Sequence, residues 1–350
     1  MDRMDYLLAI ESSCDETAAA VLDTQGRVLG ETLLSQMDHL PYGGVVPEIA
    51  ARAHLAHLPG LVDKALRRAG IEAAALGAVA ASTGPGLIGG LIVGSSFGKG
   101  FALSLGVPFI AVNHIEAHAL SPRLPGVSER EVAFPYLLML VSGGHCQCVA
   151  VEGVGRYRRL GGTIDDAAGE AFDKAAKLLG LGWPGGPALE RLAATGDARA
   201  VSLPRPLLGR PGCDFSFSGL KTAVAQIVAR GDARAEDIAA GFQAAVADVL
   251  ADRAGHALAM MRQTGSAPGL MVVAGGVAAN AAVRAALRTL ADAEGIGFSA
   301  PPQRLCTDNA VMVGWAALER LRLGEADGLA TPARPRWPLD EMRPPAEMGA

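Results

Sequence analysis

Two histidines four residues apart form the most suggestive spacing in this 350-residue chain. His114 and His118 fall on one face of a helix, where both imidazoles can reach one metal ion. A solvated helix face is the alternative interpretation. Glu116 lies two residues from each histidine, so the segment is not the H-E-x-x-H motif of zinc proteases. A second pair, His54 and His57, lies in an Ala- and Leu-rich helical segment, and we interpret it as structural or surface histidines.

Acidic side chains flank several predicted elements. Asp15 and Glu16 lie in a polar turn after the first predicted strand, and Asp308 or Thr307 can cap the predicted last helix. Other acids share one face of a helix predicted over residues 165–181, close to Lys174 and Lys177. These acids are either a functional cluster or a solvated face with ion pairs: Asp166, Glu170 and Asp173.

Glycine-rich turns follow predicted strands at Ser142-Gly-Gly-His145 and at Gly275-Gly276. Free backbone N–H groups in such turns can bind phosphate, although turn geometry alone explains each glycine. We expect the two turns to face one cleft from opposite lobes. The Walker motif is absent from the sequence, and we expect neither a Walker site nor a Rossmann dinucleotide site.

The elements that position these residues alternate between strands and helices, which predicts a mostly parallel α/β sheet. Residues 6–10 and 135–141 are strands that open two related halves. The other predicted strands span 18–22, 27–34, 77–81, 108–112, 146–151 and 270–274, and the helices span about 48–69, 86–105, 165–181, 235–262 and 307–323.

Composition excludes several classes of protein. Half of the residues are hydrophobic, which is enough for a large core, and the formal charge of −5 means that RNA contact needs a local basic patch or a partner. The five cysteines form no C-x-x-C pair, so a disulfide framework or a structural zinc site has no support. The apolar segments are too short or too interrupted for a signal peptide or a membrane helix, so we expect a cytosolic protein.

Taken together and in order, the motifs of this chain resemble those of the bacterial tRNA N6-adenosine threonylcarbamoyltransferases, the TsaD (Gcp) family. The resemblance spans roughly residues 5–325. The motifs that carry it are Glu11-Ser-Ser-Cys-Asp-Glu-Thr17, Ser82-Thr-Gly-Pro-Gly86, Asn113-His-Ile-Glu-Ala-His118, Leu140-Val-Ser-Gly-Gly-His145, Asp165-Asp-Ala-Ala-Gly-Glu-Ala-Phe-Asp-Lys174, Pro184-Gly-Gly-Pro187, Phe215-Ser-Phe-Ser-Gly-Leu-Lys221, Ala274-Gly-Gly-Val-Ala-Ala-Asn280 and Cys306-Thr-Asp-Asn309.

The resemblance implies a two-lobed actin-like ATPase fold, shared with sugar kinases and heat-shock ATPases, with a duplicated core and a central nucleotide cleft. Residues 1–130 with about 305–330 would form the first lobe and 131–304 the second. Residues 331–350, rich in Pro and Arg, are expected to be a loosely ordered tail.

The resemblance also implies site residues. One metal ion, Fe(II) or alternatively zinc, would be held by His114, His118 and Asp308. We expect these ligands to lie near the surface, so that alanine replacements leave the fold intact. Trp183 stands where the family commonly has tyrosine. The adenylate-binding positions would be Leu140, Val141, Ser142, Gly143, Gly144, Asp173, Gly186 and Asn280.

The implied reaction transfers a threonylcarbamoyl group from threonylcarbamoyl-AMP to N6 of a tRNA adenosine and releases AMP. Asp15 is the candidate to accept the amine proton, with Glu16 as the alternative. Implied partners are tRNA, a smaller TsaB-like paralogue and a TsaE-like ATPase, with no membrane. A metalloprotease and a noncatalytic actin-like partner protein are the competing hypotheses.

Overall fold

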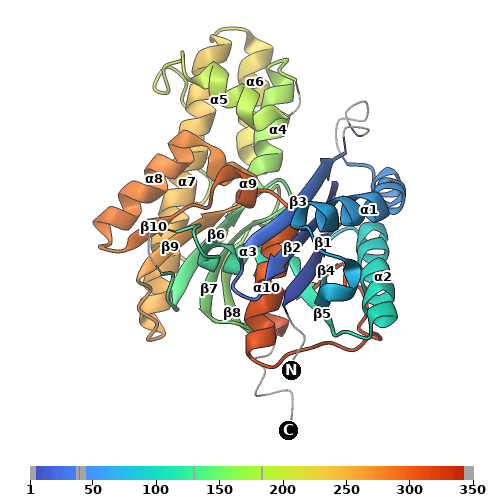
Figure 1. Ribbon diagram of the computed structural model, residues 1–350. Helices are drawn as coiled ribbons and strands as arrows, with labels where there is room; N and C mark the ends of the chain where they lie inside the picture. The colour runs from blue at the N-terminus through green and yellow to red at the C-terminus, as the bar shows by residue number, and fades with distance from the viewer. Residues whose placement is uncertain (1–4, 37–38, 40–44, 129–130, 183, 343–350) are drawn as a thin grey trace. The chain divides into compact units, whose positions relative to one another are not determined.

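The computed structural model describes residues 5–36, 39, 45–128, 131–182 and 184–342, and these residues form two compact units. The first unit contains the described residues within 1–131, 154–156 and 308–350, and the second contains those within 132–153 and 157–307. Each unit is an α/β structure built on one five-stranded sheet (Figure 1). Trp183, where the family commonly has tyrosine, lies outside the described residues.

The first sheet has the strand order β3-β2-β1-β4-β5. The first three strands form an antiparallel meander, and β4 and β5 then add in parallel to β1. β1, β2, β4 and β5 are almost entirely buried, as expected for strands that are covered on both faces. The strands are β1 (Tyr6–Glu11), β2 (Glu16–Asp23), β3 (Val28–Ser35), β4 (Leu76–Gly84) and β5 (Phe109–Asn113).

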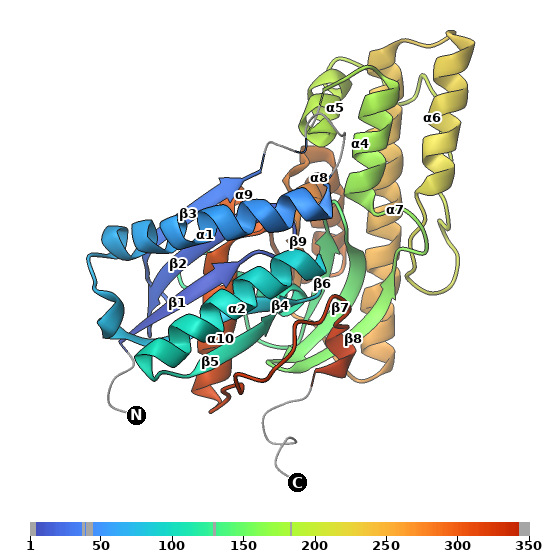
Figure 2. The same cartoon turned by 90° about the vertical axis from the view of Figure 1, so that its right-hand side faces the viewer.

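Helices cover both faces of this first sheet (Figure 2). α1 and α2 pack on the face that carries Leu8 and Ile10, whereas α10 packs on the opposite face, where Gly314 lies against Ala9. By length and composition alone α2 is apolar enough to cross a membrane, but in the structure it packs against α1 and β4. The helices are α1 (Pro47–Ala69), η2 (Ala73–Ala75), α2 (Ile88–Leu105), α3 (His114–Leu120), η3 (Ser121–Arg123), α10 (Ala310–Arg322) and η5 (Leu339–Glu341).

The second sheet repeats the order of the first: β8-β7-β6-β9-β10, so the first strand of the unit again lies at the centre. β6 pairs with β7 in antiparallel and with β9 in parallel orientation. This repeat confirms the predicted duplicated core. The strands are β6 (Tyr136–Val141), β7 (Cys146–Gly153), β8 (Arg156–Gly162), β9 (Leu270–Ala274) and β10 (Gly297–Ser299).

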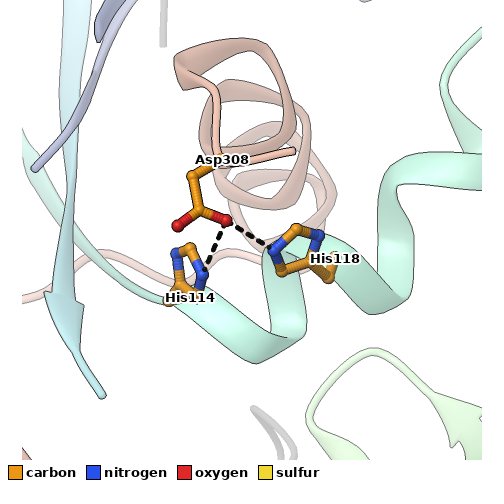
Figure 3. Close-up of side chains that lie close together, drawn as sticks. All are labelled: His114, His118 and Asp308. Atoms are coloured by element: carbon orange, nitrogen blue, oxygen red, sulfur yellow. Dashed lines mark hydrogen bonds and ion pairs between the residues drawn. The ribbon is translucent and has the colours of Figure 1, made fainter. Parts of the chain in front are cut away.

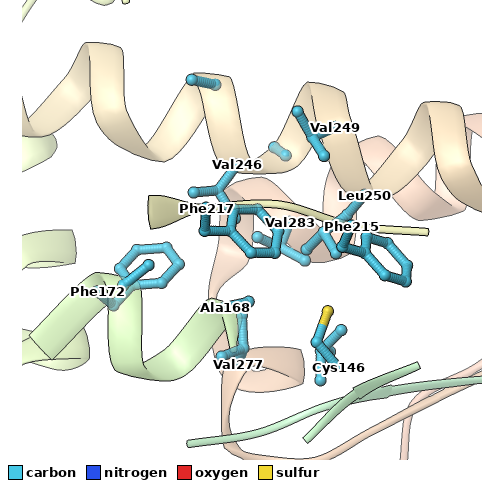
Figure 4. Close-up of a cluster of buried hydrophobic side chains, with 14 of the residues drawn as sticks. Cys146, Ala168, Phe172, Phe215, Phe217, Val246, Val249, Leu250, Val277 and Val283 are labelled. Carbon is cyan, nitrogen blue, oxygen red and sulfur yellow. The ribbon is translucent and has the colours of Figure 1, made fainter. Parts of the chain in front are cut away.

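The core of the second unit lies between its sheet and the long helix α7. Phe172 packs edge-on against Phe242 with ring centroids 5.2 Å apart. Phe215 stacks on Phe217 (Figure 4). Burying several aromatic rings contributes a large share of the hydrophobic stabilisation. The helices are α4 (Ala168–Leu178), α5 (Gly185–Ala193), α6 (Ser218–Arg230), α7 (Ala235–Gln263), η4 (Gly276–Ala279), α8 (Ala281–Ala293) and α9 (Gln303–Cys306).

The helix predicted to begin at Asp165 begins instead at Ala168. Asp165 is not helical because its carboxylate accepts hydrogen bonds from the Phe217 backbone N–H and the Ser218 hydroxyl, at 2.8 and 2.7 Å. Lys174 makes ion pairs with Asp166 and Glu170, as a solvated charged face predicts.

The expectation of a loosely ordered tail is wrong for residues 331–342. The Arg334 backbone N–H donates to the Thr83 carbonyl at 2.7 Å, and the Pro335 carbonyl accepts from the Gly86 N–H at 3.2 Å. Leu339 is buried. Backbone hydrogen bonds hold this segment against residues 83–86. The sequence did not predict this order, because backbone hydrogen bonds require no periodic pattern of side chains.

Candidate functional site

The two histidines lie on α3, a short helix that begins directly after the buried strand β5. Asn113 is its N-cap, because the side-chain oxygen accepts hydrogen bonds from the backbone N–H groups of Ile115 and Glu116 at 2.9 and 3.3 Å. The cap places His114 at the first helical position and His118 one turn later. Both side chains are nearly inaccessible, at 3 % and 2 % exposure, so the expected surface position of these ligands is wrong.

Asp308 brings a carboxylate to the same place from a part of the chain almost two hundred residues away. Its Oδ1 lies 3.3 Å from His114 Nε2 and 3.1 Å from His118 Nε2 (Figure 3). The side chain is only partly exposed. All three donor atoms lie within 4.8 Å of one another.

Neither Asp308 nor Thr307 caps the last helix, which corrects the prediction from the sequence. Asn309 takes that role, since its side-chain oxygen accepts from the Met312 N–H at 2.9 Å. The helix therefore begins at Ala310. The carboxylate of Asp308 is thus left to face the histidines.

Glu11 and Ser13 complete the surroundings of His114. Glu11 Oε2 and the Ser13 hydroxyl each lie 3.1 Å from Nδ1 of His114, the nitrogen that points away from Asp308. Glu11 is fully buried and also accepts from the Ser13 backbone N–H at 2.6 Å. A carboxylate on the second nitrogen fixes the orientation and tautomer of a ligating histidine.

The site is strongly polarised. Burial disfavours the charged form of His114, but the carboxylates of Asp308 and Glu11 outweigh it and hold the pKa of His114 well above its usual value. Burial lowers the pKa of His118, and the nearby His114 adds to that effect. Burial also opposes ionisation of Asp308, yet both histidines hold its pKa well below the usual range.

The donor set fits one metal ion. Two imidazole nitrogens and one carboxylate oxygen lie within 4.8 Å of one another, and a set of three such ligands suits iron or zinc. The second nitrogen of His114 already has the outer partner that metal-bound histidines normally have.

The acidic turn after β1 lies in the same unit. Cys14, Asp15 and Glu16 are half-buried, and Glu16 shares a hydrogen bond with Asp15. Burial, reinforced by the charges of Asp308, Asp15 and Glu11, raises the pKa of Glu16 to about 9. Glu16 therefore holds its proton at neutral pH, which leaves Asp15 as the better candidate for a proton acceptor.

The pKa of Glu16 predicts a pH effect on the metal-free protein. Because the folded-state pKa lies above the ordinary value of 4.5, the contribution of Glu16 to stability is greatest below about pH 4.5 and is lost as the pH rises towards 9. We expect a steeper loss of thermal stability over this range in the wild type than in Glu16→Gln, measured by calorimetry in the presence of a chelator. Parallel curves for the two proteins would contradict the assignment.

The two glycine turns lie in one unit, so the expectation that they come from opposite lobes is wrong. Leu140 of β6 pairs with Ala274 of β9, which brings the two strand ends together. Gly275 has φ +95°, and a Cβ there would lie 2.4 Å from the Val141 carbonyl oxygen. At Gly143 and Gly276 a Cβ would meet nothing within 4 Å, so both glycines border open space.

The other predicted adenylate positions have structural partners. The Leu140 and Val141 side chains are fully buried in β6. Asp173 accepts from the Gly185 backbone N–H at 2.9 Å and from that of Gly186, and burial raises its pKa. Asn280 caps α8 through the Val283 N–H. Its amide also donates to Gln243 at 2.8 Å.

Glu11, Ser13 and Asn113 are the residues that sequence reasoning missed. A signal existed for Glu11, a charged residue at the carboxyl end of an otherwise apolar strand, where parallel α/β sheets place their sites. For Asn113 the N-cap contacts with Ile115 and Glu116 are local, and asparagine before a helix is a cap signal. The contact of Asn113 with Trp337 and that of Ser13 with His114 join distant segments, and the local sequence contains no trace of them.

These features first define a class. The repeated strand order and the covering helices define an actin-like fold, here with a His-His-Asp cluster in the first unit. A full-length HypF structure in a phosphate- and nucleotide-bound form superimposes with a TM-score of 0.59 at 13 % identity, over 92 % of this chain and 56 % of that chain. Component A of the Acidaminococcus fermentans (R)-2-hydroxyglutaryl-CoA dehydratase superimposes with a TM-score of 0.52 at 17 % identity, over 91 % of this chain and 99 % of that chain. At such identities the likeness shows the fold alone.

Sequence comparison then supplies the family. The profile described as "TsaD: tRNA N6-adenosine threonylcarbamoyltransferase" matches residues 27–315. A Granulibacter bethesdensis protein called tRNA N6-adenosine threonylcarbamoyltransferase is 64 % identical to this chain, over 95 % of this chain and 93 % of the relative. A Gluconobacter oxydans protein of the same name is 62 % identical, over 97 % of this chain and 94 % of the relative. The chain belongs to this transferase family, and neither the protease nor the noncatalytic alternative is favoured.

Proposed function

We propose that this chain transfers the threonylcarbamoyl group of threonylcarbamoyl-AMP to N6 of the adenosine 3′-adjacent to the anticodon, in tRNAs that read codons beginning with A. The observation that carries the proposal is the convergence of His114, His118 and Asp308 in the same unit as the acidic turn of a TsaD-family chain. The family implies a metal, and we propose Fe(II), with zinc as the alternative.

The metal, when bound, would act as a Lewis acid and polarise an oxygen of threonylcarbamoyl-AMP. Asp15 would accept the proton from the attacking N6 amine. The new N–C bond forms at the carbamoyl carbon as the C–O bond to the phosphate breaks, and AMP leaves with that oxygen. Glu16, whose pKa burial raises, would donate a hydrogen bond to Asp15 and keep its carboxylate in place.

The second unit would bind the adenylate. Gly143 and Gly144 are exposed residues, and in the described part of the chain their backbone N–H groups have no protein acceptor, so we propose them as donors to phosphate oxygens. Asp173, Gly186 and Asn280 would contact the adenosine or ribose, with Leu140, Val141 and Ser142 as backbone contacts.

The partners we propose are tRNA, a smaller paralogue and an ATPase, acting in the cytoplasm. The net charge of −5 favours shared RNA contact over binding by this chain alone. Nucleoside mass spectrometry of tRNA incubated with the protein, its partners and threonylcarbamoyl-AMP tests the reaction. The modified adenosine should appear only with the complete mixture, and its absence would contradict the proposal.

Gly276→Val provides a test of the nucleotide site. A side chain there meets open space in the protein but projects where a ligand has to approach. We expect adenine-nucleotide affinity to fall about tenfold or more, roughly 1–3 kcal/mol, by calorimetry, with metal content unchanged.

Two control substitutions separate ligand obstruction from damage to the fold. Gly269→Val, at the other end of β9, also meets nothing within 4 Å and should leave affinity unchanged. Gly275→Ala forces a Cβ against the Val141 carbonyl at positive φ and should lower the melting temperature instead. Equal nucleotide affinity in Gly276→Val and the wild type would rule out this site.

A further inference from the structure

Residues 331–342, here called the C-terminal strap, are held on the first unit by contacts that the reaction described above does not use. Arg334 N–H donates to the Thr83 carbonyl, and Gly86 N–H donates to the Pro335 carbonyl. Lys99 donates to the Thr331 carbonyl. The strap thus lies along the loop 83–86, which belongs to a family motif with no role so far.

The first connection from the strap to the metal site passes through that loop. A Cβ at Gly84 would lie 2.0 Å from the Arg334 carbonyl oxygen, and one at Gly86 would lie 2.5 Å from the Ser13 carbonyl oxygen. The loop is therefore packed tightly between the strap and Ser13. The Leu87 N–H also donates to Ser13 O at 2.7 Å, and the Ser13 hydroxyl lies 3.1 Å from Nδ1 of His114.

The second connection passes through Asn113, which is fully buried. Its side-chain oxygen caps α3, while its amide nitrogen donates to the Trp337 carbonyl at 2.9 Å. One side chain thus ties the strap to the helix turn that begins with His114. The orientation of the Asn113 side chain is fixed, because its amide oxygen accepts from the backbone of α3 and its amide nitrogen donates to the Trp337 carbonyl.

We propose that the C-terminal strap is a positioning element for the metal site, which fixes His114 through Asn113 on one side and through the 83–86 loop and Ser13 on the other. The proposal rests on the metal site proposed above. It assigns a role to the Ser82-Thr-Gly-Pro-Gly86 motif and to Asn113, neither of which contacts the donor atoms.

Asn113→Ser separates the strap contact from the helix cap. Serine is an equally good N-cap but has no amide to reach the Trp337 carbonyl. We expect Zn²⁺ affinity, measured by competition with a chromophoric chelator, to fall about tenfold in this variant. It should fall about 10–100-fold in a chain that ends at Ala330. The two changes should be non-additive when combined, because both break the same link.

Matched controls come from the strap itself. A chain that ends at Met342 keeps every strap contact described here, and Arg336→Ala changes an exposed side chain. Both should bind Zn²⁺ as the wild type does. Unchanged affinity in Asn113→Ser and in the chain that ends at Ala330 would overturn the proposal. If the shortened chain fails to fold, unchanged affinity in Asn113→Ser alone would overturn it.

A metal-independent readout distinguishes failure of the strap proposal from failure of the metal site. In metal-free protein labelled with ¹⁵N-histidine, the ring signals of His114 should shift in Asn113→Ser and stay unchanged in Arg336→Ala. A wild type that binds no Zn²⁺ would contradict the metal site. The His114 ring signals would then still test whether the strap positions His114. Identical His114 signals in the wild type and Asn113→Ser would count against the strap.

Discussion

Replacing His114 and His118 together with alanine will remove the bound metal and lower threonylcarbamoyl transfer by at least about a thousandfold, roughly 4 kcal/mol. The two imidazoles supply two of the three converging donor atoms. One carboxylate alone holds a transition metal weakly. Elemental analysis of the purified variant and nucleoside mass spectrometry of its tRNA product measure the two effects.

The double variant will also be less stable than the wild type. Both histidines are buried, and their removal takes the histidine partners away from the carboxylates of Glu11 and Asp308. Breaking a buried charge pair from one side costs about 3–5 kcal/mol. Asp308→Asn, which keeps the shape of the side chain, is therefore the better test of metal loss.

His57→Ala is the matched control for the loss of a histidine. His57 lies on α1 and is exposed. Metal content and transfer should equal those of the wild type. Full metal occupancy in the double alanine variant would contradict the assignment of the ligands.

Asp15→Asn is expected to lower transfer by about 10²–10⁴-fold while metal content and nucleotide affinity stay unchanged. An amide of the same shape cannot accept the amine proton. Glu16→Gln should have a much smaller effect at pH 7, because the pKa of about 9 already keeps Glu16 neutral and glutamine resembles the neutral acid. Single-turnover assays with a fixed amount of threonylcarbamoyl-AMP compare the chemical steps directly.

The contrast between the two variants decides which group acts as the base. If Glu16→Gln lost activity while Asp15→Asn kept it, the assignment would be reversed. Wild-type activity in both Asp15→Asn and Glu16→Gln would mean that no carboxylate of this turn accepts the proton. Melting curves of both variants will show whether a change in activity reflects unfolding.

The positions of the two histidines relative to each other follow from the sequence, because helix geometry is local. A spacing of four residues puts both imidazoles on one face wherever the helix lies. Two other features were predictable because their signals are also local. An apolar run marks the bounds of β9, and a glycine in the left-handed conformation, Gly70, marks the end of α1. The family motifs added the expectation that Asp308 joins the histidines.

Only the tertiary structure decided the rest of the site. Thr307, Asp308 and Asn309 are all good N-caps, and the packing of α10 selects Asn309, which leaves Asp308 to face the histidines. The pairing of β6 with β9 puts both glycine turns in one unit, although more than a hundred residues separate them. The strap has no hydrophobic period. It is held by the Arg334 N–H, which donates to the Thr83 carbonyl, and by the Trp337 carbonyl, which accepts from the Asn113 amide. Every residue offers the same backbone groups, so such contacts are invisible until the chain has folded.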